Sequence, residues 1–322
     1  MTRFLPALLL LAACSGTSDD VPRMSDASAP DAEPAVTRIT PGRSGQERDP
    51  DVSPDGQTLL YASNEHGGNF DLFLRVRGSN TSTRVTRLEG DERFPKFNPR
   101  DPKAIAFCSN TRGSWEICLM PNYEREPDRV VVVSEAGADS LHPSWSPDGK
   151  RLVYCASNEG DEGGWILKVW EAETGRTRVL EGADGFLPEW SPTSNTIVFQ
   201  RMRRRGSWEA ALWTLDYDNG AVRNVTALFS GDGWAAINPS WSPDGRHLVF
   251  ATVAKSKARA DVFHEPDDLW LLRADGSRAT RLTTSPASDG MPCWGADGRI
   301  YFVSDRDGGP SRIWSLEPRL PE

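Results

Sequence analysis

Two clusters of basic side chains are the residues in this sequence best suited to binding an anion. The first contains Arg201, Arg203, Arg204 and Arg205, and the second contains Lys255, Lys257 and Arg259. Guanidinium and ammonium groups bind carboxylate and phosphate oxygens through charge-assisted hydrogen bonds. Both clusters occur in a chain whose formal net charge is −9. They predict an anion-binding patch for an acidic glycan, a lipid head group or a protein partner; the alternative is an ordinary solvated surface.

Four aspartates recur three or four residues before a proline, and they form a second candidate site. They are Asp91, Asp139, Asp184 and Asp289. If the fold gathers these carboxylates at one mouth, a cation would offset their mutual repulsion, since hard cations prefer oxygen ligands. Capping of the backbone where a strand begins explains the same residues. The pattern therefore leaves a structural cation and local capping as alternatives, and no other cofactor is expected.

The four histidines are weaker candidates for a metal site. His66, His142 and His264 are expected on loops of one face, whereas His247 lies within an apolar strand. Imidazole is a common metal ligand, but these three side chains come from distant parts of the chain and only a narrow centre would gather them. We identify no acid–base pair and no nucleophile with a positioned partner. Binding is therefore favoured over catalysis, and no catalytic residue is predicted.

A repeat positions all of these residues. Six prolines mark its copies, and each is followed by an aromatic or apolar residue and a tight turn: they are residues 50, 95, 143, 188, 239 and 292. The full pattern Pro-Ser-Trp-Ser-Pro-Asp-Gly stands at Pro143 and again at Pro239. Pro, Asp and Gly in this order are typical of a turn between two strands. Intervals of 45 to 53 residues with several short strands inside them indicate the blades of a propeller.

The number of strands predicts how the ring closes. Each repeat has room for four antiparallel strands, but the last repeat ends six residues after Leu316 with only three. Upstream of the first repeat, Val36-Thr37-Arg38-Ile39-Thr40 is similar to Ala279-Thr280-Arg281-Leu282-Thr283, an outer strand. We therefore expect an all-β, six-bladed propeller of four-stranded antiparallel blades over residues 36–322, with the N-terminal strand completing the last blade. The repeated tryptophans should pack between blades.

The N-terminus predicts export. A basic start and an apolar run form a signal peptide over residues 1–13, and Leu11-Ala12-Ala13-Cys14 resembles the lipobox of bacterial lipoproteins. The resemblance implies that Cys14 is lipidated, with an ordinary signal peptide as the alternative. Ser15 resembles the residue found in lipoproteins sent to an outer membrane, facing the periplasm or the cell surface. Residues 14–35 are mostly Ser, Asp, Ala and Pro and are expected to form a flexible tether.

Composition and cysteines narrow the remaining classes. The acidic net charge argues against nucleic-acid binding, and after residue 13 the sequence has no apolar run of the length that spans a bilayer. Attachment to a membrane is expected through the lipid alone, and the protein is expected to be a monomer. Cys108, Cys118, Cys155 and Cys293 remain. A bridge between Cys108 and Cys118 is one alternative, and buried free thiols are the other.

The repeat names a family. The Trp-Ser-Pro-Asp-Gly units, together with strand ends such as Arg281-Leu282-Thr283, resemble the TolB-type propeller repeat over about residues 36–316. This family includes envelope scaffold proteins, the propellers of prolyl-oligopeptidase-like proteases and oligogalacturonate lyase. The sequence has no Gly-x-Ser-x-Gly motif of the protease relatives. The resemblance implies a non-catalytic protein- or glycan-binding module in a bacterial envelope, with a metal-dependent polysaccharide lyase as the alternative.

Overall fold

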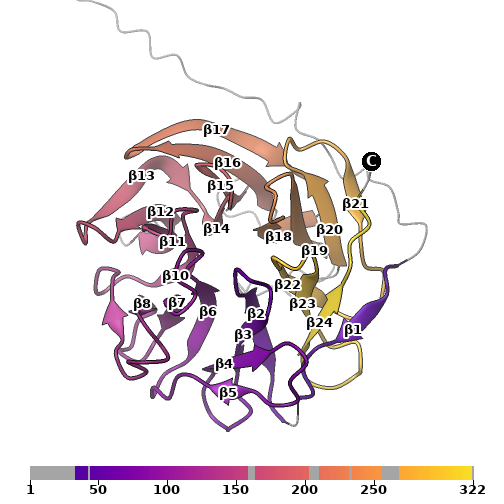
Figure 1. Cartoon of the computed structure of the whole chain (residues 1–322). Helices are drawn as coiled ribbons and strands as arrows, with labels where there is room; N and C mark the ends of the chain where they lie inside the picture. The colour runs from indigo at the N-terminus through magenta and orange to yellow at the C-terminus, as the bar shows by residue number, and fades with distance from the viewer. Residues whose placement is uncertain are drawn as a thin grey trace, which may run out of the picture.

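The computed structural model describes residues 33–42, 44–158, 164–202, 210–231, 234–254 and 268–320. Within these residues the regular elements are 24 strands, grouped in six four-stranded antiparallel sheets. The sheets stand like blades around a central channel (Figure 1). Among the same residues there is no helix of the length and apolarity that crossing a membrane requires. The predicted all-β, six-bladed propeller is confirmed.

Each blade is one antiparallel sheet whose strands follow the chain outwards from the channel, apart from the last blade, where the outermost strand is the first of the chain. Blade 1 consists of β2 (Glu47–Val52), β3 (Thr58–Ser63), β4 (Asp71–Val76) and β5 (Thr83–Arg84). Blade 2 consists of β6 (Glu92–Phe97), β7 (Ile105–Ser109), β8 (Glu116–Met120) and β9 (Val131–Val132). Blade 3 consists of β10 (Ser140–Trp145), β11 (Arg151–Asn158), β12 (Gly164–Glu171) and β13 (Thr177–Asp184). Blade 4 consists of β14 (Phe186–Trp190), β15 (Thr196–Met202), β16 (Ala210–Asp218) and β17 (Ala221–Phe229). Blade 5 consists of β18 (Trp234–Trp241), β19 (His247–Ala254), β20 (Asp268–Arg273) and β21 (Ala279–Arg281). Blade 6 consists of β22 (Asp289–Trp294), β23 (Ile300–Ser304), β24 (Arg312–Leu316) and β1 (Val36–Arg38).

Two faces follow from this order. The turns between the first and second strands of each blade share one face, called the turn face below. The loops that enter each blade and those between its second and third strands share the opposite one, called the loop face. On the turn face, Gly149 has a φ of 68° and its N–H donates to the Ser146 carbonyl at 2.8 Å. The Ser146 hydroxyl accepts the Arg151 N–H at 3.0 Å and donates to Asp148 at 2.5 Å, so this turn satisfies its own polar groups.

The N-terminal strand closes the ring as predicted. Strand β1 pairs with β24, and Val36, Thr37 and Arg38 lie opposite Leu316, Ser315 and Trp314. The sheet order β1-β24-β23-β22 shows that the last blade draws its outer strand from the start of the chain. This pairing joins the two ends of the folded domain and covers the edge of β24, which would otherwise expose unpaired backbone groups.

An Arg-x-Thr sequence explains why this segment can replace an ordinary outer strand. The hydroxyl of Thr40 accepts the N–H of Ile313 at 3.1 Å, and the hydroxyl of Thr283 accepts the N–H of Leu269 at 3.0 Å. In both places the arginine two residues earlier donates from Nε to the threonine carbonyl, at 2.8 Å for Arg38 and 3.0 Å for the equivalent arginine in blade 5. The same side-chain chemistry therefore ends both outer strands.

The repeated tryptophans pack between blades, as expected. Trp145, Trp190, Trp241 and Trp294 are each less than 10% exposed. The indole Nε1 of Trp145 donates to the Lys96 carbonyl at 3.3 Å, and that of Trp241 donates to the Glu189 carbonyl at 3.2 Å. Each of these two rings therefore reaches back to the preceding blade, and burial of such large apolar surfaces is a main source of stability.

The four described cysteines are buried free thiols. On the paired strands β7 and β8, Cys108 lies opposite Ile117 and Cys118 lies opposite Phe107. Residues directly opposite share a face of the sheet and successive residues alternate, so the two thiols project from opposite faces. The alternative of a Cys108–Cys118 bridge is thereby answered in favour of free thiols. Burial raises the pKa of Cys118 to about 12, which keeps it protonated.

We predict that Thr40 contributes to closure through its hydroxyl. Thr40→Val keeps the shape but removes the hydroxyl that accepts the buried Ile313 N–H and donates to Glu47. That N–H then keeps only its longer bond to Glu47, at 3.4 Å. The free energy of unfolding should fall by about 1–3 kcal/mol, measured by urea unfolding. Thr37→Val, at an exposed position of β1, is the control and should change it by less than about 0.5 kcal/mol. Equal unfolding midpoints for Thr40→Val and the parent would show that the ring closes without this bond.

Candidate functional site

The channel is lined by six residues that share one backbone conformation. Each innermost strand has a β-bulge, and the residue just before the marker proline has a positive φ between 49° and 57°: Asp49, Phe94, His142, Leu187, Asn238 and Met291. This left-handed conformation is costly for residues other than glycine. Because this conformation recurs in all six blades, the bulge is a regular feature of the repeat. It turns one side chain of each blade towards the channel.

These six side chains differ in chemical type although their backbones are equivalent. They are a carboxylate, an aromatic ring, an imidazole, an aliphatic chain, an amide and a thioether. Packing between like blades would favour like residues at this position, as it does for the tryptophans. We conclude that the channel-lining position is the place in the repeat where the protein varies its surface chemistry.

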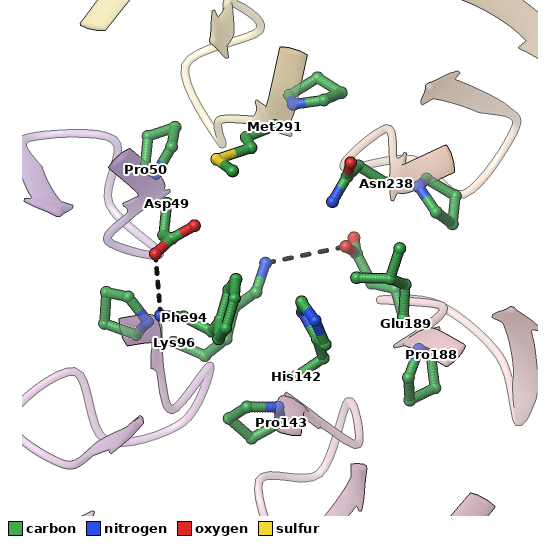
Figure 2. A pocket seen from close by; sticks show the side chains of 14 residues that line it. Asp49, Pro50, Phe94, Lys96, His142, Pro143, Pro188, Glu189, Asn238 and Met291 are labelled. Carbon is green, nitrogen blue, oxygen red and sulfur yellow. Dashed lines mark hydrogen bonds and ion pairs between the residues drawn. The ribbon is translucent and has the colours of Figure 1, made fainter. Parts of the chain in front are cut away.

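A pocket of about 70 Å³ with a mixed polar and apolar lining lies inside this ring. Figure 2 shows its lining, with Asp49, Phe94, His142, Asn238 and Met291 pointing towards the axis and Lys96 crossing it. A volume of this size holds a few water molecules and is much smaller than the several hundred Å³ of an ordinary ligand pocket. The channel therefore presents a shaped mouth, and its interior has no room for a sugar polymer.

Charged side chains fill the layer below the mouth. The Nζ of Lys96 lies 3.3 Å from Asp51 Oδ1 and 3.7 Å from Glu189 Oε2. Burial raises the pKa of both carboxyl groups, and their negative charges in turn raise the pKa of Lys96. Lys96 thus links blade 2 to blade 1 and, across the channel, to blade 4. Opposite charges in such a confined place stabilise each other only when they are paired.

Neighbouring blades are also joined by a repeated side-chain-to-backbone hydrogen bond. The acceptor is the side chain of the residue directly after the marker proline. The donor is a backbone N–H of the next blade, that of the residue two positions after its marker proline. The bonds run from Phe97 to Asp51 at 2.8 Å, from Trp190 to Ser144 at 2.9 Å, from Trp241 to Glu189 at 3.0 Å and from Trp294 to Ser240 at 3.2 Å. Lys96 holds the same place in blade 2, but an ammonium group cannot accept a hydrogen bond.

Asp49, His142 and Asn238 are the polar side chains of the mouth itself. Asp49 is ion-paired with Arg93, whose guanidinium lies 4.9 Å from the ring centroids of both Phe70 and Phe94. The imidazole of His142 packs against Phe94 with ring centroids 3.9 Å apart. Burial lowers the pKa of His142 to about 3, so this side chain is neutral at physiological pH.

The basic clusters lie mostly outside the described residues. Six of the seven basic residues lie outside the described residues: Arg203, Arg204, Arg205, Lys255, Lys257 and Arg259. His264 and Cys14 also lie outside them. The described member, Arg201, pairs with Asp184 at 2.5 Å and lies 4.9 Å from the ring centroid of Trp213. Two residues predicted for different sites therefore neutralise each other, and the anion-binding patch stays a prediction.

The four aspartates predicted to meet at the channel mouth do not come together. Asp91 accepts the Phe70 N–H at 2.8 Å and Asp139 accepts the Trp115 N–H at 2.9 Å, which is the capping alternative. Asp289 is fully buried and pairs with Arg306 at 2.7 Å. With Asp184 paired to Arg201, each of the four has its own partner, and none of them lines the pocket.

The described histidines do not meet. His66 packs near Phe73 and His142 packs against Phe94, whereas His247 lies near Trp294 at the turn-face end of β19. Across the described ranges, no group of three or more His, Cys, Asp or Glu side chains is arranged to hold a metal ion. The sequence interpretation missed the channel-lining ring, although the residue before each marker proline was available as a signal.

Three acidic residues, Glu47, Glu92 and Asp289, are buried where an innermost strand begins, at the loop-face end. Glu92 begins β6, two residues before Phe94, and is fully buried. Burial raises its pKa to about 7, although hydrogen bonds from the Thr86 and Ser109 hydroxyls favour the charged form. Thr86 belongs to the Arg-x-Thr sequence of blade 1, so Glu92 connects that blade to the channel strand of blade 2.

Comparison with known proteins agrees with this architecture. Residues 35–219 match the family model described as the TolB beta propeller domain. The Tol-Pal system protein TolB of Anaeromyxobacter dehalogenans is 34% identical over 134 residues, covering 41% of this chain and 27% of that protein. Dipeptidyl-peptidase 5 of Porphyromonas gingivalis is 26% identical over 196 residues, covering 54% and 26%. The chain thus spans about a quarter of the length of these curated relatives.

Solved structures show the same fold. TolB of Acinetobacter baumannii superposes with a TM-score of 0.61 at 21% identity, covering 78% of this chain and 57% of that one. An oligogalacturonate lyase in complex with manganese gives a TM-score of 0.62 at 17% identity, covering 92% and 96%. At these identities the likeness concerns the fold alone.

We predict that Glu92 makes stability depend on pH. Its pKa in the folded protein, about 7, is above the ordinary 4.5, so the folded state binds more protons in this window. The free energy of unfolding should therefore fall, relative to Glu92→Gln, as pH rises from 5 to 8, by roughly 2–3 kcal/mol. Urea unfolding at several pH values measures this, with Glu126→Gln, at an exposed loop position, as the control. Parallel pH profiles for wild type and Glu92→Gln would contradict it.

Proposed function

The chain belongs to the TolB β-propeller family, and we propose that it is an envelope protein, lipid-anchored through Cys14, that binds a protein partner at the mouth of its channel without catalysing a reaction. The observation that carries the proposal is the ring of six equivalent backbone positions with six unlike side chains. All six blades share this strained backbone conformation, so the repeat itself does not call for six different side chains. Strain of this kind collects at functional sites.

The composition of the mouth favours a protein as ligand. Phe94 and Met291 are of the types enriched in the centres of protein interfaces. Loops on a rigid scaffold are the usual carriers of binding function. The names of the related envelope proteins, TolB of the Tol-Pal system, support the same class of partner. A short chain segment or a loop of a partner fits a mouth of these dimensions better than a folded glycan chain.

The lyase alternative has less support. An enzyme of that kind would need its metal ligands and a carbohydrate cleft near the channel. The described histidines lie in three separate places, and the pocket is small. The likeness to oligogalacturonate lyase is at 17% identity and concerns the fold. Binding at the mouth requires none of the residues that catalysis would need.

Site-specific crosslinking tests the proposed site. A photoreactive side chain replaces Leu187 at the mouth, or Lys150 on the turn face as the control, in the full-length tagged protein within cells. We expect one envelope protein to be crosslinked from position 187 and not from 150. Phe94→Ala with Met291→Ala should reduce that adduct at least about tenfold, since truncated hot-spot residues cost 1–2 kcal/mol or more each. Adducts from position 150 alone, or cleavage of polygalacturonate by the purified protein, would refute the proposal.

The proposed anchor has its own test. Cys14→Ser removes the thiol that would carry the lipid, and the variant should move from the detergent phase to the aqueous phase in phase partitioning. A single acyl chain anchors weakly and two anchor stably, so complete transfer is expected. Cys155→Ser, at a buried cysteine, is the matched control and should partition like the parent. A Cys14→Ser protein that stays in the detergent phase would exclude lipidation at this cysteine.

A further inference from the structure

The layer below the mouth contains one ammonium group between two carboxylates that come from different blades. We propose that Lys96 is a built-in cation of the channel: its ammonium occupies the position that a divalent cation would otherwise take between Asp51 and Glu189, so that the ring of blades is complete without a metal. The inference concerns the channel interior and does not depend on the partner proposed above.

The two carboxylates are held in place independently of Lys96. Asp51 Oδ2 accepts the Phe97 N–H at 2.8 Å, and Glu189 Oε1 accepts the Ser240 hydroxyl at 3.1 Å and the Trp241 N–H at 3.0 Å. The other oxygen of each carboxylate, Oδ1 of Asp51 and Oε2 of Glu189, faces the ammonium. Because these bonds fix both side chains, the oxygens that face the ammonium should stay aimed at one point when the lysine is removed. The Cys293 thiol, which donates to Asp51 Oδ1 at 3.8 Å, also holds that oxygen in place.

The position is accessible from the channel and short of positive charge. The side chains of Lys96, Asp51 and Glu189 are 25%, 12% and 18% exposed, and Lys96 and Glu189 line the pocket. Figure 2 shows Lys96 extended across the axis towards Glu189. Arg93 is engaged with Asp49, and His142 is neutral. Among the described lining residues, Lys96 is thus the cation placed to balance these two carboxylates.

Charge arithmetic explains why a divalent cation would fit. Two ionised carboxylates and one ammonium leave one negative charge. Burial raises the pKa of both acids, and the charge of Lys96 partly offsets this. A divalent cation would neutralise both and would accept water as its further ligands, since Ca²⁺ and Mn²⁺ bind carboxylate oxygens. The ammonium of Lys96 supplies less positive charge than a divalent cation. Because it is covalently part of the chain, it requires no metal from the surroundings and does not dissociate.

Thermal unfolding of the full-length protein in the presence and absence of metal tests the inference. In chelator, Lys96→Ala should melt roughly 5–15 °C below wild type, because one partner of a buried charge group has been removed. Millimolar MnCl₂ or CaCl₂ should restore at least half of this loss. The melting temperature of wild type should be the same with and without metal. Lys96→Ala combined with Glu189→Gln should not respond to metal, because one of the two carboxylates is gone.

A second variant keeps the test decisive if Lys96→Ala folds poorly. Lys96→Met with Glu189→Gln removes the ammonium and one carboxylate together and should fold without metal. Lys96→Ala that folds only when MnCl₂ or CaCl₂ is present supports the inference. Three results overturn it: wild type gains as much from metal as Lys96→Ala does, Lys96→Ala is as stable as wild type in chelator, or Lys96→Ala stays unfolded with metal while the second variant folds.

Discussion

The left-handed residue before each marker proline is the constraint on which the rest of this structure depends. A residue such as Leu187 or Met291 holds a φ near 49° at the bulge of an innermost strand. Proline follows it and restricts the conformations open to the preceding residue. The bulge turns one side chain into the channel and sets the next polar side chain against the neighbouring blade. One distortion, repeated six times, thereby creates both the surface of the mouth and the bonds that join the blades.

The turn face and the channel mouth differ in how much their side chains vary from blade to blade. The turn face repeats the same Ser-Pro-Asp-Gly chemistry, which satisfies itself locally and leaves little variety for recognition. The channel mouth varies from blade to blade, and two of its side chains, Phe94 and Leu187, also pack against the core. Blade 2 differs within the layer below, because Lys96 cannot accept such a bond and reaches across to Glu189. Rigidity around the channel and variety at its mouth suit a surface that recognises a partner.

Much of the fold could be predicted from the sequence because its determinants are local. The turn residues, the interval between prolines and the similarity of Arg38-Ile39-Thr40 to Arg281-Leu282-Thr283 all act over short stretches, and the ring closure followed from them. The candidate site was harder. The sign of φ at Asp49 or Phe94 is not visible in residues that rarely adopt it. The pairing of Arg201 with Asp184 and the capping by Asp139 depend on which neighbours three-dimensional packing supplies.

Hydrogen exchange of single backbone amides tests most directly whether side chains of one blade hold the next around the channel. The amides of Phe97, Trp190, Trp241 and Trp294 donate to side chains of the preceding blade. For the equivalent amide, that of Trp145, the corresponding residue of the preceding blade is Lys96, and its ammonium group cannot accept a hydrogen bond. We expect the first four to exchange only through global unfolding and Trp145 to exchange faster by at least about tenfold. Equal protection of all five amides, or rapid exchange of the first four, would contradict the account.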